Sequence, residues 1–266
     1  MVITIETKLD GGGGDFLAVV LPPKGGWSLP SWKSQLTAIT ILTTSILLAL
    51  RPSHHSPPCT IPALAPLLPP SHQATIEAAT PVPAGSSHGE GPANTPYPWI
   101  PTSLPPLCAL TIRVSSSPTS SYRLGLYLPH PSLWKRRLLT VGNGGFAGGI
   151  NWIDMAPGPH YGMASLSTDT GHNSSSTETS WANANPEAKQ DWGWRALHGS
   201  VVVGRHLVER YYSHKIRYSY FSGCSTGGRQ GLRETMEFPG SFDGVLVGAP
   251  AWWASRVYNW RVGWAG

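Results

Sequence analysis

One short stretch of the chain, SGCSTGGRQG at Ser222–Gly231, carries residue types that could do covalent chemistry. Ser225 lies between Gly223 and Gly227 at the G-x-S-x-G spacing, which is typical of a serine presented on a sharp turn between a strand and a helix. A serine held in this way can attack a carbonyl carbon, provided that a base accepts its proton. The stretch therefore predicts Ser225 as the nucleophile of an acyl transfer.

The segments on both sides of Ser225 have the patterns that such a turn requires. IRYSYFSG before it reads as a strand, TGGRQGLRETMEFP after it predicts a helix closed by Pro239, and FDGVLVGAP predicts a further strand. A glycine-rich turn that contains a serine by chance is the alternative. The order of strand, turn, helix and strand favours the nucleophile.

An acyl transfer also needs backbone N–H groups that stabilise the oxyanion. The residue after the nucleophile, Thr226, is expected to supply the first of these donors. The second is expected from GNGGFAGG, where Gly144 or Gly145 would let a substrate oxygen approach the main chain. A glycine-rich turn with no ligand role is the alternative for this loop.

A base for Ser225 is harder to find in the sequence. His172 and His198 both precede the serine, whereas the order expected for this turn puts the acid and the histidine after it. We therefore interpret both histidines as structural or pocket-lining residues. The same interpretation applies to three aspartates before the serine, Asp154, Asp169 and Asp191. The 41 residues after Ser225 (266 − 225) contain one aspartate, Asp243, and no histidine.

The elements that must position these residues change in kind along the chain. Residues 52–131 carry 18 of the 26 prolines, which predicts a wrap of turns and short extended pieces, with one antiparallel pair near Leu107–Leu128. Beyond it, RRLLTVGNGG and GMASLSTDTG read as buried strands, and RALHGSVVVGRHLVERYYS has helical spacing. Strands separated by helices indicate an α/β fold with a mostly parallel sheet.

Composition excludes several classes of partner. The net charge is +5, but the basic residues are scattered, and the densest group, WKRR at Trp134–Arg137, is better explained as a solvated strand edge than as a nucleic-acid site. No cysteine and histidine spacing suits zinc. Only 12% of residues are charged, with 30 glycines and 26 prolines, which is typical of a secreted, loop-rich enzyme.

The N-terminal region contains one long uncharged segment, LTAITILTTSILLAL, at 36–50. It resembles the apolar part of a signal peptide and is short for a membrane span, which needs about 20 residues. We expect residues 1–32 to be a spurious or disordered extension, 33–51 to be signal-like and 52–266 to form one partial α/β domain. An uncleaved signal anchor is the alternative, and stable membrane insertion is not expected.

Five runs taken together resemble the tannase and feruloyl esterase family: VGNGGFAGGI, STDTGH, DWGWRALH, YFSGCSTGGRQGL and FDGVLVGAPA. The resemblance implies a secreted α/β-hydrolase that cleaves esters of aromatic acids such as gallic and ferulic acid. It also implies Ser225 as nucleophile and an oxyanion hole from Thr226 and Gly144 or Gly145. The substrate would be a small or plant cell-wall-linked aromatic ester, and no nucleic acid is expected as a partner.

The three cysteines also acquire roles from this resemblance. It implies a disulfide between Cys59 and Cys108, and a bridge from Cys224 to a cysteine beside the catalytic histidine. That cysteine, the acid, the histidine and a calcium-binding lid would all lie past Gly266. The resemblance therefore predicts an incomplete α/β-hydrolase fold, cut where the lid begins, with a Pro-rich N-terminal wrap and no cofactor or metal of its own.

Three further expectations remain. The sequon NSS predicts glycosylation at Asn173, in keeping with a secreted protein. The rival function is a non-catalytic remnant or truncated gene product that binds aromatic or polysaccharide ligands. A third interpretation makes Cys224 the nucleophile, but the residue beside the serine of such a turn points its side chain away from the pocket.

Overall fold

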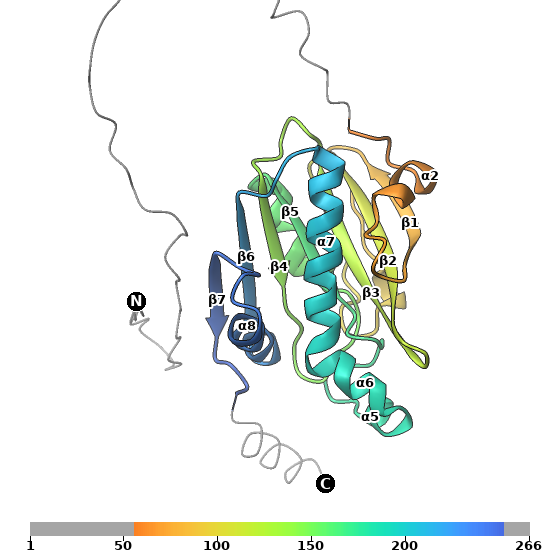
Figure 1. Ribbon diagram of the computed structural model, residues 1–266, viewed down its shortest axis with the longest axis vertical. Coiled ribbons are helices and arrows are strands. Elements are labelled where there is room, and N and C mark those ends of the chain that lie inside the picture. Colours follow the sequence, from red (N-terminus) through yellow and green to blue (C-terminus); the bar gives the residue numbers. More distant parts are fainter. Residues whose placement is uncertain (1–55, 253–266) are drawn as a thin grey trace, which may run out of the picture.

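A computed structural model describes residues 56–252 of the chain, so the predictions for residues 1–51 lie outside the described part. Its centre is one seven-stranded sheet in the order β1-β2-β3-β5-β4-β6-β7 (Figure 1). The strands are β1 (Ala74–Val82), β2 (Leu107–Ser117), β3 (Ser120–Pro129), β4 (Arg137–Val141), β5 (Met163–Thr168), β6 (Tyr218–Cys224) and β7 (Gly244–Gly248).

Helices connect and cover the strands. The α-helices are α2 (Ile61–Leu64), α3 (Trp152–Met155), α4 (Pro157–His160), α5 (Ser180–Ala184), α6 (Pro186–Gln190), α7 (Ala196–Tyr212) and α8 (Thr226–Glu237). Short 3-10 turns are η2 (Ala65–Leu67) and η3 (Gly91–Ala93), and η4 (Asp191–Arg195) is a π-helical turn. Within the described residues, none of these helices is long and apolar enough to cross a membrane.

The antiparallel half of the sheet confirms the predicted strand pair. β2 runs against β3 with Leu107 opposite Pro129, and β1 pairs with the other side of β2. β1 was not among the predicted strands, because the proline-rich stretch that contains it was expected to form turns and short extended pieces. Since β1 forms the edge of the sheet, Pro81 costs the sheet no central hydrogen bond.

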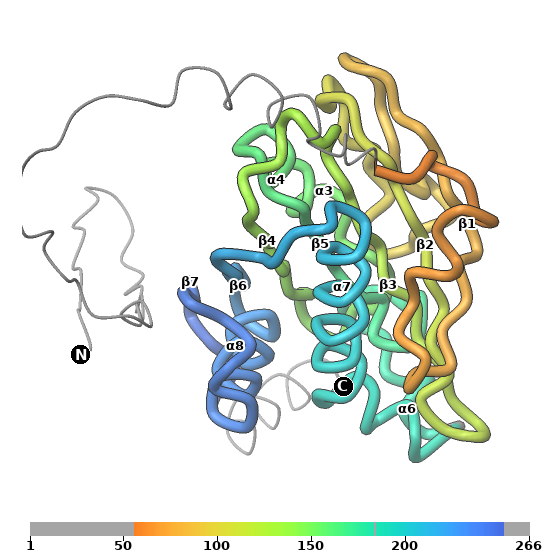
Figure 2. Tube along the Cα trace, turned by 45° about the horizontal axis from the view of Figure 1, so that its top comes forward, coloured from red at the N-terminus to blue at the C-terminus, as the bar shows by residue number. Residues whose placement is uncertain are grey.

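The parallel half confirms the predicted α/β pattern. β5, β4, β6 and β7 are parallel neighbours, and β3 joins them to the antiparallel half. α7 connects β5 to β6 and packs on β5, while α8 connects β6 to β7 (Figure 1). α3 and α4 lie between β4 and β5 in the chain and cover the opposite face of the sheet (Figure 2).

The core has one layer on each face of the sheet. Four apolar residues at helical spacing in α7 are all buried: Leu197, Val201, Val208 and Tyr211. On the other face Trp152 and Ile150 pack against Tyr127 of β3. Gly125 of β3 leaves the space for this packing, since a Cβ there would lie 2.6 Å from the Trp152 ring. The sheet is therefore packed between two layers of helices.

The implied disulfide between Cys59 and Cys108 is confirmed. The two Cα atoms are 5.6 Å apart, and the bond joins the segment before α2 to β2 across 49 residues. Leu64 of α2 is fully buried against the same core. The Pro-rich N-terminal wrap is thus attached to the sheet both covalently and by packing.

Candidate active site

Ser225 lies on the turn between β6 and α8, at the carboxyl end of the parallel strands. Its backbone has φ 58° and ψ −116°, a conformation that a residue with a side chain adopts only under constraint. Two hydrogen bonds supply that constraint, because Ser225 N donates to Gly248 O at 2.9 Å and Ala251 N donates to Ser225 O at 2.9 Å. The end of β7 therefore holds the serine in the sharp turn expected of a nucleophile.

Glycines allow the backbones around Ser225 to approach closely. A Cβ on Gly223 would lie 2.7 Å from the carbonyl carbon of Gly227, which accounts for the small residue on each side of the serine. A Cβ on Gly142, just after β4, would lie 2.6 Å from the Cα of Gly227. The first turn of α8 therefore touches the loop that follows β4.

This contact brings together the two segments expected to stabilise an oxyanion. Thr226 is the buried first residue of α8, where helix N–H groups lack intrahelical partners. Gly144 has open space where its Cβ would be, and its N–H donates to the Tyr97 hydroxyl at 3.0 Å. Gly145 has a φ of +56° and contacts Ser176, so glycine is required there for the loop conformation itself.

Three residues in or beside this loop were not singled out from the sequence: Tyr97, Asn143 and Gln230. Burial raises the pKa of Tyr97, so its hydroxyl stays protonated near neutral pH. Asn143 and Gln230 are each 2% exposed and hydrogen-bond to one another. Tyr97 and its partner Gly144 are 47 residues apart in the chain, and Asn143 and Gln230 are 87 residues apart. No local sequence pattern predicts contacts at that range.

Both histidines considered as bases have side-chain partners other than Ser225. His198 of α7 hydrogen-bonds to Glu234 at 3.0 Å. Glu234 is nine residues beyond Ser225 on α8, about 13 Å along a helix with a 1.5 Å rise. His172 stacks on Trp181 with ring centroids 4.1 Å apart, and its Nδ1 accepts from Ser174 N at 3.3 Å.

The aspartates that precede the serine take part in hydrogen bonds that hold the scaffold. Asp169 accepts from Arg123 Nε at 3.0 Å, and burial raises its pKa to about 6 against the opposing effect of Arg123 and two backbone N–H groups. Asp191 accepts from Arg195 Nε at 2.6 Å. Asp154 accepts from the side chain of Asn151 at 2.8 Å. These contacts give all three carboxylates a structural role.

The environment of His172 predicts a loss of stability in acid. Burial lowers the pKa of His172 to about 4, so the unfolded chain takes up a proton between pH 6.5 and 4 that the folded chain does not. Its contribution to the unfolding free energy therefore falls as the pH falls through this window, by about 2 kcal/mol after allowance for partial exposure. Urea denaturation of the unchanged chain and of His172→Gln at several pH values measures this contribution.

The comparison with His172→Gln is needed because Asp169 has the opposite effect. Its raised pKa makes the folded chain bind a proton between pH 6 and 3.8 that the unfolded chain releases, so its contribution grows as the pH falls. Both proteins share this contribution, and it cancels in the difference between them. A difference that stays constant from pH 7 to pH 4 would contradict the assignment to His172.

Two other predicted positions are exposed. Cys224 carries a free thiol at the exposed end of β6. Asn173 is exposed, but its side-chain amide donates to Ala93 O at 2.7 Å, and its oxygen accepts from Thr95 N at 3.0 Å. Glycosylation at Asn173 stays a prediction. No group of three metal-binding side chains lies together within the described ranges of the chain.

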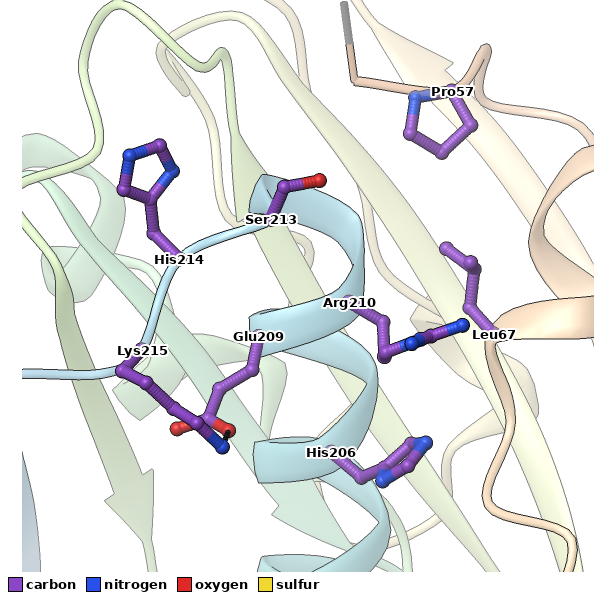
Figure 3. Close-up of a pocket in the computed structure, with 8 residues that line it drawn as sticks. All are labelled: Pro57, Leu67, His206, Glu209, Arg210, Ser213, His214 and Lys215. Carbon is purple, nitrogen blue, oxygen red and sulfur yellow. Dashed lines mark hydrogen bonds and ion pairs between the residues drawn. The ribbon is translucent and has the colours of Figure 1, made fainter. Parts of the chain in front are cut away.

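A large surface groove lies elsewhere on the molecule. It has a volume of about 800 Å³ and is lined at the end of α7 by His206, Glu209, Arg210, Ser213, His214 and Lys215, with Pro57 and Leu67 opposite (Figure 3). α7 ends where β6 begins, whereas Ser225 follows the last residue of β6. Seven residues of strand, about 23 Å at 3.3 Å per residue, separate the two ends. The groove is therefore not the site of Ser225.

Comparison with known proteins places these features in a family. The model of the family described as tannase and feruloyl esterase matches residues 108–263. A probable feruloyl esterase B-2 of Aspergillus flavus is 38% identical over 155 residues, which cover 58% of this chain and 29% of that protein. Feruloyl esterase C of Talaromyces stipitatus is 38% identical over 154 residues, which cover 58% of this chain and 28% of that protein. The chain spans less than a third of these curated relatives.

Solved structures agree with this match. Feruloyl esterase B from Aspergillus oryzae aligns with a TM-score of 0.60 and 38% identity, over 67% of this chain and 34% of that one. Tannin acyl hydrolase from Aspergillus niger aligns with a TM-score of 0.57 and 28% identity, over 73% of this chain and 38% of that one. The predicted α/β-hydrolase fold class and the predicted family resemblance are both confirmed.

Proposed function

The chain belongs to the tannase and feruloyl esterase family, a family of carboxylic ester hydrolases, and on that premise we propose that Ser225 is the nucleophile of an aromatic-acid esterase. The single observation that carries this proposal is the constrained backbone of Ser225 between β6 and α8. Such strain needs a reason, and a serine that must project from a tight turn toward a substrate provides one.

The reaction would proceed by acyl transfer. The Ser225 Oγ attacks the ester carbonyl carbon while a base takes its proton, and the carbonyl oxygen becomes an oxyanion. The N–H groups of Thr226 and of Gly144 or Gly145 would stabilise that oxyanion. To do so, the Gly144 N–H would exchange its present acceptor, the Tyr97 hydroxyl, for the oxyanion. Collapse of the intermediate breaks the bond to the alcohol, which leaves with a proton. Water then attacks the acyl-serine and releases the acid.

The proposed substrates are esters of aromatic acids, gallic and ferulic acid among them. The relatives with 38% identity are named feruloyl esterases, and a structural neighbour with 28% identity is named a tannin acyl hydrolase. The Cys59–Cys108 disulfide supports secretion, since such bonds persist in oxidising compartments.

The base is the component that the described residues do not place beside Ser225. No histidine follows Ser225 in the sequence, and His172 and His198 are held by Trp181 and Glu234. If Ser225 is the nucleophile and no side chain of the tested chain serves as its base, a base added in solution should accelerate the reaction. Free imidazole, the side chain of histidine, is the matching reagent.

We predict that imidazole accelerates cleavage of 4-nitrophenyl ferulate by the purified chain in a manner that depends on Ser225. Ser225→Ala should reduce the rate to that of imidazole alone, because no acyl-serine can form. Release of 4-nitrophenolate across an imidazole titration gives the rate. Ser132→Ala, an exposed serine far from the turn, is the matched control and should keep the full response.

Two results would count against the proposed function. One is a rate that Ser225→Ala leaves unchanged in both the absence and the presence of imidazole. The other is no acceleration over imidazole alone by a chain that circular dichroism shows to be folded, which would favour a non-catalytic remnant.

A further inference from the structure

Two amide side chains lie buried between the loop after β4 and the helix after Ser225. Gln230 Oε1 accepts a hydrogen bond from Asn143 N at 2.9 Å, and Gln230 Nε2 donates to Asn143 Oδ1 at 3.1 Å. Each residue is 2% exposed. The pair closes a ring of hydrogen bonds between segments that are 87 residues apart in the chain.

The orientation of both amides is determined by a third set of contacts. Asn143 Nδ2 donates to Gly149 O at 3.2 Å and to Thr168 O at 2.9 Å. Both partners are carbonyl oxygens, so the nitrogen of Asn143 must face them and its oxygen must face Gln230. The Gln230 amide is then fixed as well, with its nitrogen toward Asn143 Oδ1 and its oxygen toward Asn143 N.

The pair connects the two places from which oxyanion donors are expected. Asn143 directly precedes Gly144, and Gln230 is four residues beyond Thr226 on α8. At Gly227, in the first turn of α8, a Cβ would lie 3.1 Å from Asn143 O, so the two backbones already touch. A change at Gln230 therefore alters the separation between the loop and the start of the helix.

We propose that Gln230 and Asn143 are positioning residues that set the distance between the two oxyanion donors. This rests on the proposed function, because it assigns the pair a purpose in acyl transfer. Donors aimed at an oxyanion act on the transition state more than on the bound ester. Loss of the pair should therefore slow the chemical step and leave substrate or probe binding nearly unchanged.

Gln230→Glu tests the proposal with an almost isosteric change. The new carboxylate can still accept from Asn143 N, but its second oxygen faces Asn143 Oδ1, and two acceptors repel one another. Rotation of the Asn143 amide cannot relieve this repulsion, because its nitrogen would lose the hydrogen bonds to Gly149 O and Thr168 O. When the carboxyl is protonated it donates to Asn143 Oδ1 again, so acid restores the original pattern.

The readout is the rate at which a fluorophosphonate labels Ser225, measured by intact mass in Gln230→Glu and in the unchanged chain from pH 5.5 to 8.5. We expect the maximal labelling rate of the variant to be about tenfold lower at pH 8.5 and to approach that of the unchanged chain at pH 5.5. The probe concentration for half-maximal rate should not change. Tyr97, a titratable neighbour of Asn143, stays protonated throughout, because burial raises its pKa, and the nearby charge of Asp154 acts in the same direction.

The matched control is Gln190→Glu, the same chemical change at an exposed position of α6. It should label at the original rate at every pH. Two results would overturn the proposal: equal maximal rates at pH 8.5, or a deficit in Gln230→Glu that acid does not relieve. If Gln230→Glu does not fold at pH 8.5, Gln230→Met replaces it and should show a similar deficit at both pH values, and normal labelling would overturn the proposal.

If the fluorophosphonate labels none of the chains, the result counts against the proposed function, and the role of the Asn143–Gln230 pair is tested separately. Peptide-level hydrogen exchange then decides, after correction for intrinsic exchange rates at each pH. We expect faster exchange in residues 142–149 and 226–231 of Gln230→Glu at pH 8.5 and not at pH 5.5. Unchanged exchange in both segments would show that the pair does not hold the loop against the helix.

Discussion

Gly142→Ala is expected to lower the unfolding free energy by about 3 kcal/mol and to reduce labelling of Ser225 at least tenfold. The added Cβ would lie 2.6 Å from Gly227 Cα and 2.9 Å from Gln230 Oε1. The closest of these is backbone, so the loop after β4 and the start of α8 must move apart. Urea denaturation gives the first quantity, and fluorophosphonate labelling of the folded fraction gives the second.

Gly144→Ala is the matched control, two residues along the same loop. A Cβ at Gly144 meets nothing within 4 Å, so the unfolding free energy should change by less than about 0.5 kcal/mol. Equal losses of stability in the two variants would show that the contact between Gly142 and Gly227 does not constrain the site.

Loss of the disulfide is the second large effect that we expect. Replacing both Cys59 and Cys108 by alanine should lower the unfolding free energy by about 4 kcal/mol, since the bond closes a loop of 49 residues in the unfolded chain. The melting temperature should fall by about 10 °C. Differential scanning calorimetry measures both changes.

Cys224→Ser controls for the loss of a thiol. Cys224 is free and exposed, so this variant should have the same melting temperature as the unchanged chain under oxidising conditions. A reductant should destabilise Cys224→Ser but leave the double alanine variant unaffected. If the double variant has the same melting temperature as the unchanged chain, packing of α2 alone holds the N-terminal wrap.

Much of the fold could be predicted because its signals are local. The strand before Ser225, the helix after it and the apolar face of α7 each follow from short-range periodicity, and the structure confirms them. β1 could not be predicted in the same way. Whether Pro81 is tolerated depends on its place at the sheet edge, and the order of the strands is a property of the whole chain.

The candidate site also has a part with local sequence signals and a part that depends on long-range contacts. The types and spacing of Ser225 and the GNGG loop are local and could be predicted, although their catalytic roles stay predictions. Tyr97, Asn143 and Gln230 could not, because each acts through a partner distant in sequence. The π-helical turn η4 before α7 was also missed, since Asp191 holds it through Arg195 within a network that includes Ser120 of β3.

The central claim is that Ser225 is the nucleophile, and the most direct measurement is the mass-spectrometric location of a fluorophosphonate adduct. Trypsin should release Tyr218–Arg229, a peptide that contains Ser219, Ser222, Cys224 and Ser225. We predict that fragment ions place the adduct on Ser225 and that Ser225→Ala abolishes it. An adduct on Cys224 or on another serine, or persistence of the adduct in Ser225→Ala, would contradict the claim.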